Sequence, residues 1–209
     1  MKDNKKHKKA EYGILITGLI ILLAATFVIA LCAGQYSVSV PEVTKILASR
    51  FVNVTKTWSN TAEGVVFTLR LPRIIGAVLV GSALSLSGAA YQGVFKNPLV
   101  APDLLGVSSG ACVGASVAIL LHLNSFGVQA MAFVAGILAV GLTLFIPRLI
   151  KNTNMTMLVL SGIIVKGIMD SVMGIIKYVA DPETELQSIT YWQLGSLTKV
   201  LPKDLFTVG

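Results

Sequence analysis

Apolar runs alternate with short polar segments along most of this chain. An α-helix rises about 1.5 Å per residue, so about 20 apolar residues cover the hydrocarbon core of a bilayer. The uncharged stretch at residues 104–147 is too long for one span and fits two, with a break at residues 122–127. With the runs at about 14–33, 74–95 and 155–179, the pattern predicts an all-α polytopic membrane helix bundle of about five spans.

The polar segments set the expected topology. Residues 1–12 form a basic tail, and lysines beside a span favour the cytoplasmic side of the membrane. Residues 35–69 are expected to form an extracytoplasmic segment, in which a short surface helix begins at Pro41. Residues 181–209 are expected to form a second outer loop and the start of the next span.

A cleaved signal peptide is the alternative interpretation of the N-terminal region. The apolar run from Ile14 to Ala33 is about twenty residues long, whereas the apolar part of a signal peptide has about 7–15. This run is therefore expected to be a retained first span that leads outward from a cytoplasmic N-terminus.

The composition excludes most classes of soluble protein. Hydrophobic residues make up 54% of the chain, charged residues 13%, and the mean hydropathy is +0.78. The net charge of +7 could suggest nucleic acid, but the lysines of the basic tail are better explained as a cytoplasmic topology anchor beside a span, so membrane lipid and no nucleic acid is expected as a partner. Cys32 and Cys112 lie in apolar runs, and no residues have metal-ligand spacing, so no metal site is expected.

Small residues recur at every fourth position in two predicted helices. Such seams let helix backbones approach closely where lipid supplies no hydrophobic drive for association. Chance in a chain rich in glycine and alanine is the alternative explanation. The first seam comprises Ala77, Gly81, Ser85, Ala89 and Gly93, and the second comprises Gly106, Gly110, Gly114 and Ala118.

The last predicted span contains an opposite pair of charges, Lys166 and Asp170. Charges inside a membrane are costly and are usually paired or functional. Residues four apart share a helix face, so the two side chains could neutralise one another. The alternative is a polar position on a transport pathway.

A serine hydrolase is a competing interpretation, because residues 106–110 satisfy the pattern G-x-S-x-G. The pattern requires a strand before the serine or a histidine facing it. His122 lies 14 residues after Ser108, which is about 21 Å of helix. The chain is therefore not expected to be an enzyme.

Several motifs together resemble the FecCD family, the permease subunits of ABC importers for ferric siderophores, haem and cobalamin. The motifs cover most of the chain beyond the basic tail. They are Leu69-Arg70-Leu71-Pro72-Arg73, the Gly-Ser-Ala-Leu-Ser-Leu-Ser-Gly-Ala run at 81–89, Gln92, Asn97-Pro98-Leu99, Pro102, residues 104–110 and Tyr191-Trp192-Gln193-Leu194-Gly195-Ser196-Leu197.

The resemblance implies a ten-span permease fold of the type II ABC importer kind. Residues 1–209 resemble its first half, a single membrane domain that is truncated before the loop that docks on the ATPase. The implied partners are a second permease subunit, identical or different, cytoplasmic ATPase subunits and an extracytoplasmic substrate-binding protein. ATP would be used by the partner subunit, and no cofactor is expected in this chain.

The resemblance favours a ferric siderophore as substrate and a bacterial plasma membrane as location. Haem and cobalamin remain alternatives, because the motifs do not distinguish among the chelates. A further alternative is a membrane receptor that holds the binding protein without transporting a substrate.

Site residues follow from the matched motifs. Arg70 and Arg73 resemble the outward arginines that receive carboxylates of the binding protein; contact with lipid headgroups or capping of the second helix is the alternative. The resemblance also implies a cytoplasmic gate, whose alternative is a loop tightened by Pro98. The gate would comprise Asn97 and Leu99 on one side and Asn154, Met155 and Thr156 on the other.

Overall fold

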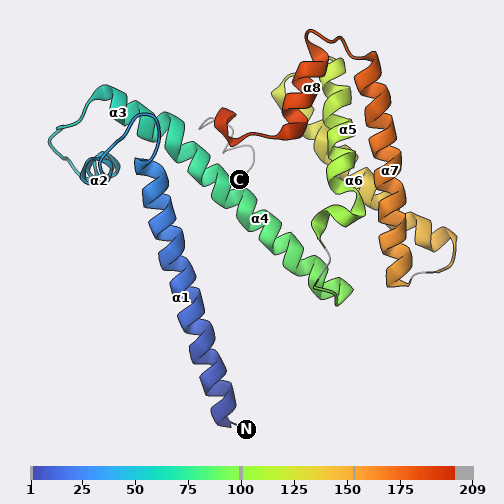
Figure 1. Ribbon diagram of the computed structural model, residues 1–209, viewed down its shortest axis with the longest axis horizontal. Helices are drawn as coiled ribbons and strands as arrows, with labels where there is room; N and C mark the ends of the chain where they lie inside the picture. The colour runs from blue at the N-terminus through green and yellow to red at the C-terminus, as the bar shows by residue number, and fades with distance from the viewer. Residues whose placement is uncertain (1, 99–100, 153, 201–209) are drawn as a thin grey trace. The chain divides into compact units, whose positions relative to one another are not determined.

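The computed structural model describes residues 2–98, 101–152 and 154–200, and every regular element in these ranges is a helix (Figure 1). Four helices are long and apolar enough to cross a membrane. These candidate spans are Glu11–Cys32, Asn60–Phe95, Ser125–Leu149 and Met155–Val179. Contacts divide the chain into two units, residues 1–80 with those from 197 onward, and residues 81–196. Each unit is described by itself.

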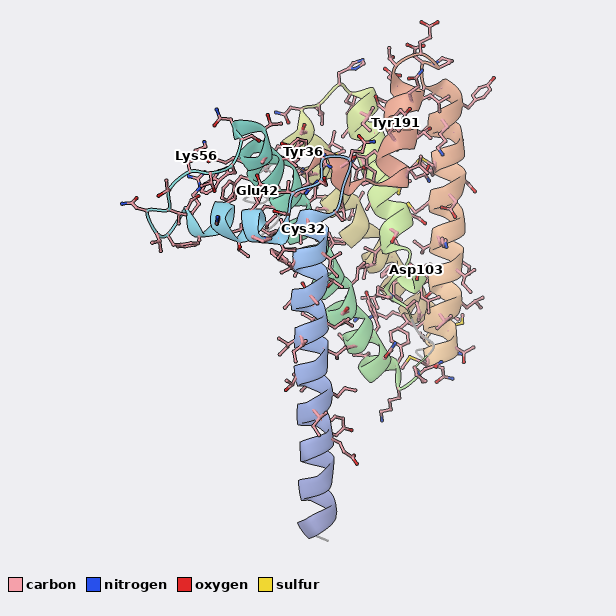
Figure 2. All side chains as sticks on the ribbon, turned by 60° about the vertical axis from the view of Figure 1, so that its left-hand side comes forward. Cys32, Tyr36, Glu42, Lys56, Asp103 and Tyr191 are labelled. Carbon is pink, nitrogen blue, oxygen red and sulfur yellow. The ribbon has the colours of Figure 1, made fainter. Side chains whose placement is uncertain are left out.

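The first unit begins with α1 (Lys2–Cys32), followed by the short helix α2 (Val40–Ala48). Figure 2 shows Cys32 at the end of α1 and Tyr36 in the loop after it. Ser39 has an extended backbone just before α2, and Pro41 fits the first turn because its fixed φ suits a helix start. The surface helix predicted from Pro41 is thus present.

A small apolar core holds the first unit together. Val43 and Ile46 lie three residues apart on one face of α2, and both are fully buried. They pack in one cluster with the end of α1 and the start of the next helix. The cluster comprises Leu31, Val38, Val43, Ile46, Trp58, Ala62 and Val66.

The second long helical segment starts earlier than the sequence predicted. α3 (Asn60–Gly64) runs through a π-helical segment, η1 (Val65–Arg70), into α4 (Leu71–Phe95) without a break. The Ser59 hydroxyl caps the start by accepting a hydrogen bond from the Ala62 amide at 3.0 Å. The sequence predicted the second span only from residue 74, whereas the helix starts at Asn60 and buries one face at Ala62 and Val66 in the core. The extracytoplasmic position of residues 35–69 stays a prediction.

The second unit contains η2 (Pro102–Leu105), α5 (Val107–Leu120), α6 (Ser125–Leu149), α7 (Met155–Val179) and α8 (Glu185–Leu194). The predicted break near residue 122 lies between α5 and α6, and the Asn124 side chain caps α6 by accepting from the Gly127 amide at 2.8 Å. α5 has 14 residues, about 21 Å, and is shorter than a full span. The described residues therefore hold four full-length candidates and one short apolar helix, where five full spans were predicted.

α5 and α6 pack closely through glycines of the second seam. An added Cβ at Gly110 would lie 2.5 Å from the Ala139 Cβ, and one at Gly114 would overlap the Met131 carbonyl. By contrast, the residues of the first seam on α4 are exposed, and Gly81 and Gly93 have no neighbour within 4 Å of such a Cβ. A packing role for that seam stays a prediction.

The η2 turn is held between α6 and α7 by its backbone. The buried Thr143 hydroxyl of α6 donates to the Leu105 carbonyl at 3.0 Å. The Ser161 hydroxyl of α7 bonds the Thr143 carbonyl at 2.8 Å, which ties α7 to α6 at the same level. Gly162 lies directly against the Leu104 carbonyl, because it has no side chain to keep the turn away. This arrangement fixes the loop that follows α4 to the helix pair.

Three helices end in the same way, with a non-glycine residue in the left-handed region. Lys96, His122 and Lys151 have φ of 49°, 52° and 54°. In each case the next amide reaches back five residues to a helix carbonyl, which is the Schellman pattern; for α4 the Asn97 amide bonds the Gln92 carbonyl at 3.3 Å. The chain thus turns sharply at the ends of α4, α5 and α6.

Candidate functional site

Arg70 lies at the end of η1, where its guanidinium caps the C-terminus of α1. It donates to the Leu31 carbonyl at 2.6 Å, to the Cys32 carbonyl at 3.2 Å and to the Tyr36 carbonyl. The last carbonyls of a helix have no partner within the helix and carry partial negative charge, so a cation is a favourable cap. The predicted docking residue therefore has a partner inside the chain.

Gly34 makes room for this cap. Its φ is +153°, and an added Cβ would lie 2.6 Å from Arg70 Nη2. Nothing in the sequence pattern marked Gly34 or the Tyr36 carbonyl, because their role depends on bringing together segments 34 to 39 residues apart.

Arg73 differs from Arg70 in its surroundings. It lies in the first turn of α4 and is half-buried, and its Nε is buried without a hydrogen-bond partner among the described residues. A buried donor of this kind costs free energy until an acceptor reaches it. Of the two predicted docking arginines, Arg73 is the one with an unmet hydrogen-bonding group.

Three predicted gate residues line one hollow in the second unit. Asn97, just after α4, and Met155 and Thr156, at the start of α7, surround a hollow of about 450 Å³. The remaining lining is apolar and comprises Phe95, Val159, Leu160 and Ile163. The structure thus brings together residues 58 positions apart, as the gate hypothesis requires, while their role stays a prediction.

The other two predicted gate residues are placed differently. Asn154 precedes α7 with an extended backbone, and its amide bonds the Asn152 side chain at 3.3 Å, but it does not line the hollow. Leu99 lies outside the described residues.

The charges of α7 do not pair with one another. Lys166 and Asp170 are both exposed, and the ion pairs found in the described part of the chain lie elsewhere. The prediction that they form a self-neutralised pair is wrong for this structure. Lys177, further along the helix, donates to Gln193 Oε1 of α8 at 2.5 Å.

Ser108 and His122, the residues of the hydrolase hypothesis, lie near opposite ends of α5. Ser108 is preceded by a 3₁₀ turn and not by a strand, and His122, beyond the far end of α5, pairs with Glu185 at 3.3 Å. Within the ranges that the structure describes, no group of three or more His, Cys, Asp or Glu side chains is close enough to hold a metal.

Outside the predicted spans, Asp181 organises the loop between α7 and α8. Its carboxylate accepts from the Thr184 hydroxyl at 2.6 Å and from the Glu183 amide at 3.2 Å. These hydrogen bonds, first the one from Thr184, hold the pKa of Asp181 below its usual value because they stabilise the charged form.

Comparison with known proteins shows to which family this helical chain belongs. It matches the FecCD transport family over residues 21–208. The chain belongs to the FecCD family. This confirms the resemblance inferred from the Arg70-to-Gly110 motifs, and the relatives named below are transport proteins rather than enzymes.

The FecCD chain is 35% identical over 186 residues to the molybdate import system permease protein MolB of Haemophilus influenzae, with 89% of this chain and 55% of MolB covered. It is 38% identical over 137 residues to the hemin transport system permease protein HmuU of Yersinia pestis, with 62% of this chain and 40% of HmuU covered. A solved structure of a metal-chelate type ABC transporter in an inward-facing conformation matches with a TM-score of 0.78 and 32% identity, covering 93% of this chain and 57% of the other. The FecCD chain thus spans about half the length of the proteins it matches.

Proposed function

We propose that this chain is the membrane permease part of an ABC importer that carries a metal chelate, and that its substrate is a ferric siderophore. The observation that carries the proposal is the fold: the helices match a metal-chelate type ABC transporter over 93% of this chain. Haem is supported by the similarity to HmuU, and molybdate by the similarity to MolB over most of the chain. The proposed location is a bacterial plasma membrane, with the N-terminus in the cytoplasm.

The proposed mechanism is alternating access, driven by ATP hydrolysis in partner subunits. The chain performs no bond chemistry and provides a passage and docking surfaces. The hollow lined by Asn97, Met155 and Thr156 is suited to a gate, because it lies between the end of α4 and the start of α7, where the helices terminate. Small displacements at such ends do not break the helix packing at Gly110 and Gly114.

Uptake by cells tests the function. A strain that lacks the gene for this protein should lose uptake of one labelled substrate, and a copy of the gene should restore it. We expect loss of ⁵⁵Fe–siderophore uptake, with ⁵⁵Fe–haem, labelled cobalamin and ⁹⁹Mo–molybdate compared in the same strains. Loss of molybdate or haem uptake alone would replace the siderophore assignment, and unchanged uptake of all four would contradict the importer assignment in favour of a non-transporting receptor.

Docking of a substrate-binding protein is proposed for Arg73. Reversal of its charge, Arg73→Glu, should weaken binding of the binding protein at least about tenfold, because a guanidinium that meets a carboxylate becomes a like charge. Binding is measured with the permease in nanodiscs and the purified binding protein in solution.

A matched control separates docking from folding. Arg50 is also an arginine of the first unit, but its guanidinium lies 4.8 Å from the Phe67 ring. Arg50→Glu should change the affinity less than Arg73→Glu. Equal affinities of the wild-type and Arg73→Glu proteins would remove the docking assignment while leaving the transport proposal intact.

A further inference from the structure

The loop that follows α2 exposes two large apolar side chains. Phe51 is 90% exposed and its neighbour Val52 is 64% exposed, although Val43 and Ile46 of the preceding helix are fully buried. A single exposed apolar residue is common on a protein surface. Two adjacent ones at the end of a helix, one of them an aromatic ring with few contacts in its own unit, indicate a contact with something outside that unit.

α2 lies at the level where α1 ends. In Figures 1 and 2, α2 runs across the C-terminal end of α1, and α3 lies further from the N-terminal end of α1. Residues 33–59 join two candidate spans and therefore lie at a single surface of the membrane. The first of these spans has 22 residues, about 33 Å, so it ends close to the border of the hydrocarbon. α2 therefore lies along that surface, near the lipid headgroups.

One side of α2 is turned away from the apolar core. Val43 and Ile46 pack in the core together with the start of the second long helical segment. At about 100° per residue, the opposite side of the helix carries uncharged, exposed residues. With the loop that follows, they form a continuous stretch that we call the α2 face. It comprises Pro41, Thr44, Ala48, Phe51 and Val52.

Several polar groups of the α2 face are satisfied within the chain, which lowers the cost of a contact with lipid. The Thr44 hydroxyl donates to the Pro41 carbonyl at 2.9 Å. The amides of Phe51 and Val52 both donate to the Ala48 carbonyl at 2.9 Å. An unpaired backbone donor is costly away from water. Phe51 and Val52 can therefore leave water with their amides paired.

Two cations support and flank this surface. The Arg50 guanidinium lies 4.8 Å from the centre of the Phe67 ring, which holds the start of the loop against η1. Lys45 is exposed at the edge of the α2 face and takes part in none of the ion pairs of the described residues, and Glu42 beside it is partly buried. A lysine at such an edge can lay its aliphatic stem on apolar surface and place its ammonium group among phosphates.

We propose that the α2 face binds the phospholipid surface, with Phe51 and Val52 inserted below the headgroups and Lys45 contacting lipid phosphates. An amphipathic segment bound in this way lies about 5–10 Å deep, at the boundary between headgroups and acyl chains. The proposal goes beyond the proposed function, because it requires only that α1 and α4 cross the membrane and not that any particular substrate is carried.

A substrate-binding protein is the alternative occupant of the α2 face. Such a protein approaches from water, whereas α2 lies level with the end of a span and α3 lies on its outer side (Figure 1). Interfaces between proteins also use hydrogen bonds, and the Thr44 hydroxyl and the two loop amides are already bonded within the chain. Position and chemistry therefore both favour lipid.

Spin labelling of the protein in phospholipid nanodiscs tests the proposal. A nitroxide is attached at Phe51→Cys in a protein that also carries Cys32→Ala and Cys112→Ala. Its collisions with oxygen, which concentrates in hydrocarbon, are compared with its collisions with a polar nickel complex, which stays in water. The ratio of oxygen to nickel collisions should be at least about fivefold higher at position 51 than at Thr57→Cys, an exposed position further along the same segment, because the label at 51 lies below the headgroups.

A third label position calibrates the measurement. Leu22 is 60% exposed near the middle of the first candidate span, so Leu22→Cys should give the highest ratio. A ratio at position 51 equal to that at Thr57→Cys would place the loop in water and overturn the proposal. Low collision rates with both reagents would show that protein covers the loop, which would also overturn it. The importer assignment is tested separately by uptake and survives either result.

A second label site leaves the Phe51 side chain in place. With the nitroxide at Ala48→Cys, the ratio should fall at least about threefold when Phe51→Asp is added, because a carboxylate does not stay below the headgroups. Asn53→Asp adds the same charge two residues further along and should change the ratio less. Phe51→Asp should also bind the substrate-binding protein as the wild type does. A loss of that affinity with no change in the ratio would assign the α2 face to the binding protein instead.

Discussion

Gly162→Ala should destabilise the second unit by about 3 kcal/mol, the upper part of the range for overpacking in a close-packed site. The added Cβ would overlap the Leu104 carbonyl and lie 3.0 Å from the Leu104 carbonyl carbon and 3.3 Å from the Leu105 Cα. All three are backbone atoms, so no side chain can rotate out of the way. The turn cannot shift freely either, because Thr143 holds the Leu105 carbonyl.

Thermal unfolding of the purified protein in detergent measures this effect. Gly141 in α6 is the matched control, because an ideal Cβ there has no neighbour within 4 Å and alanine favours a helix. Gly141→Ala should leave the unfolding temperature unchanged or raise it slightly. If Gly162→Ala unfolds at the wild-type temperature, η2 does not rest on α7 as described.

Loss of the cap on α1 should have the second largest effect. Arg70→Met removes the donors to the carbonyls of Leu31, Cys32 and Tyr36, and we expect a loss of about 2 kcal/mol, because hydrogen bonds from a charged group are stronger than neutral ones but this site is half-exposed. Gly34→Ala should act through the same contact, since its Cβ would collide with the guanidinium. Proteolysis of the loop after α1 reports the loosened junction.

The two substitutions should not be additive. If both act by displacing Arg70 from the α1 carbonyls, the double variant should be no less stable than the worse single variant. Arg73→Met is the control, because the described chain offers Arg73 Nε no acceptor to lose. Full additivity of Arg70→Met and Gly34→Ala, or an equal effect of Arg73→Met, would contradict the cap. Non-additivity would also bear on docking, because any effect of Arg70 on the affinity for the binding protein would then act through the cap on α1.

The sequence predicted those parts of the fold that depend on local pattern. The apolar runs gave the long helices, Pro41 gave the start of α2, and the polar residues near His122 gave the break between α5 and α6. The start at Asn60 was missed because the residues from 60 to 70 are mixed in polarity, and their helix is stabilised by burial of Ala62 and Val66 in a core assembled from distant segments.

The sequence predicted the candidate site only in part, again because contacts between distant segments are not visible in a local pattern. Family motifs pointed to Asn97, Met155 and Thr156, which the structure places around one hollow. Contacts made through backbone atoms cannot be predicted from composition or periodicity, because every residue type has the same backbone carbonyl. The partners of Arg70 are carbonyls, and so are the groups that meet Gly162 and Thr143. For Lys166 and Asp170, spacing predicted a shared face, but whether side chains on one face pair depends on what else is within reach.

The left-handed residues that end α4 and α6 are lysines, although glycine would adopt this backbone without strain. A lysine at a helix C-terminus is attracted by the negative end of the helix dipole, which offsets part of the conformational cost. A lysine next to the end of an apolar span can also extend its ammonium group into the headgroup region, where cations are favoured. We therefore expect the residue that turns the backbone to serve as a membrane anchor at the ends of both helices.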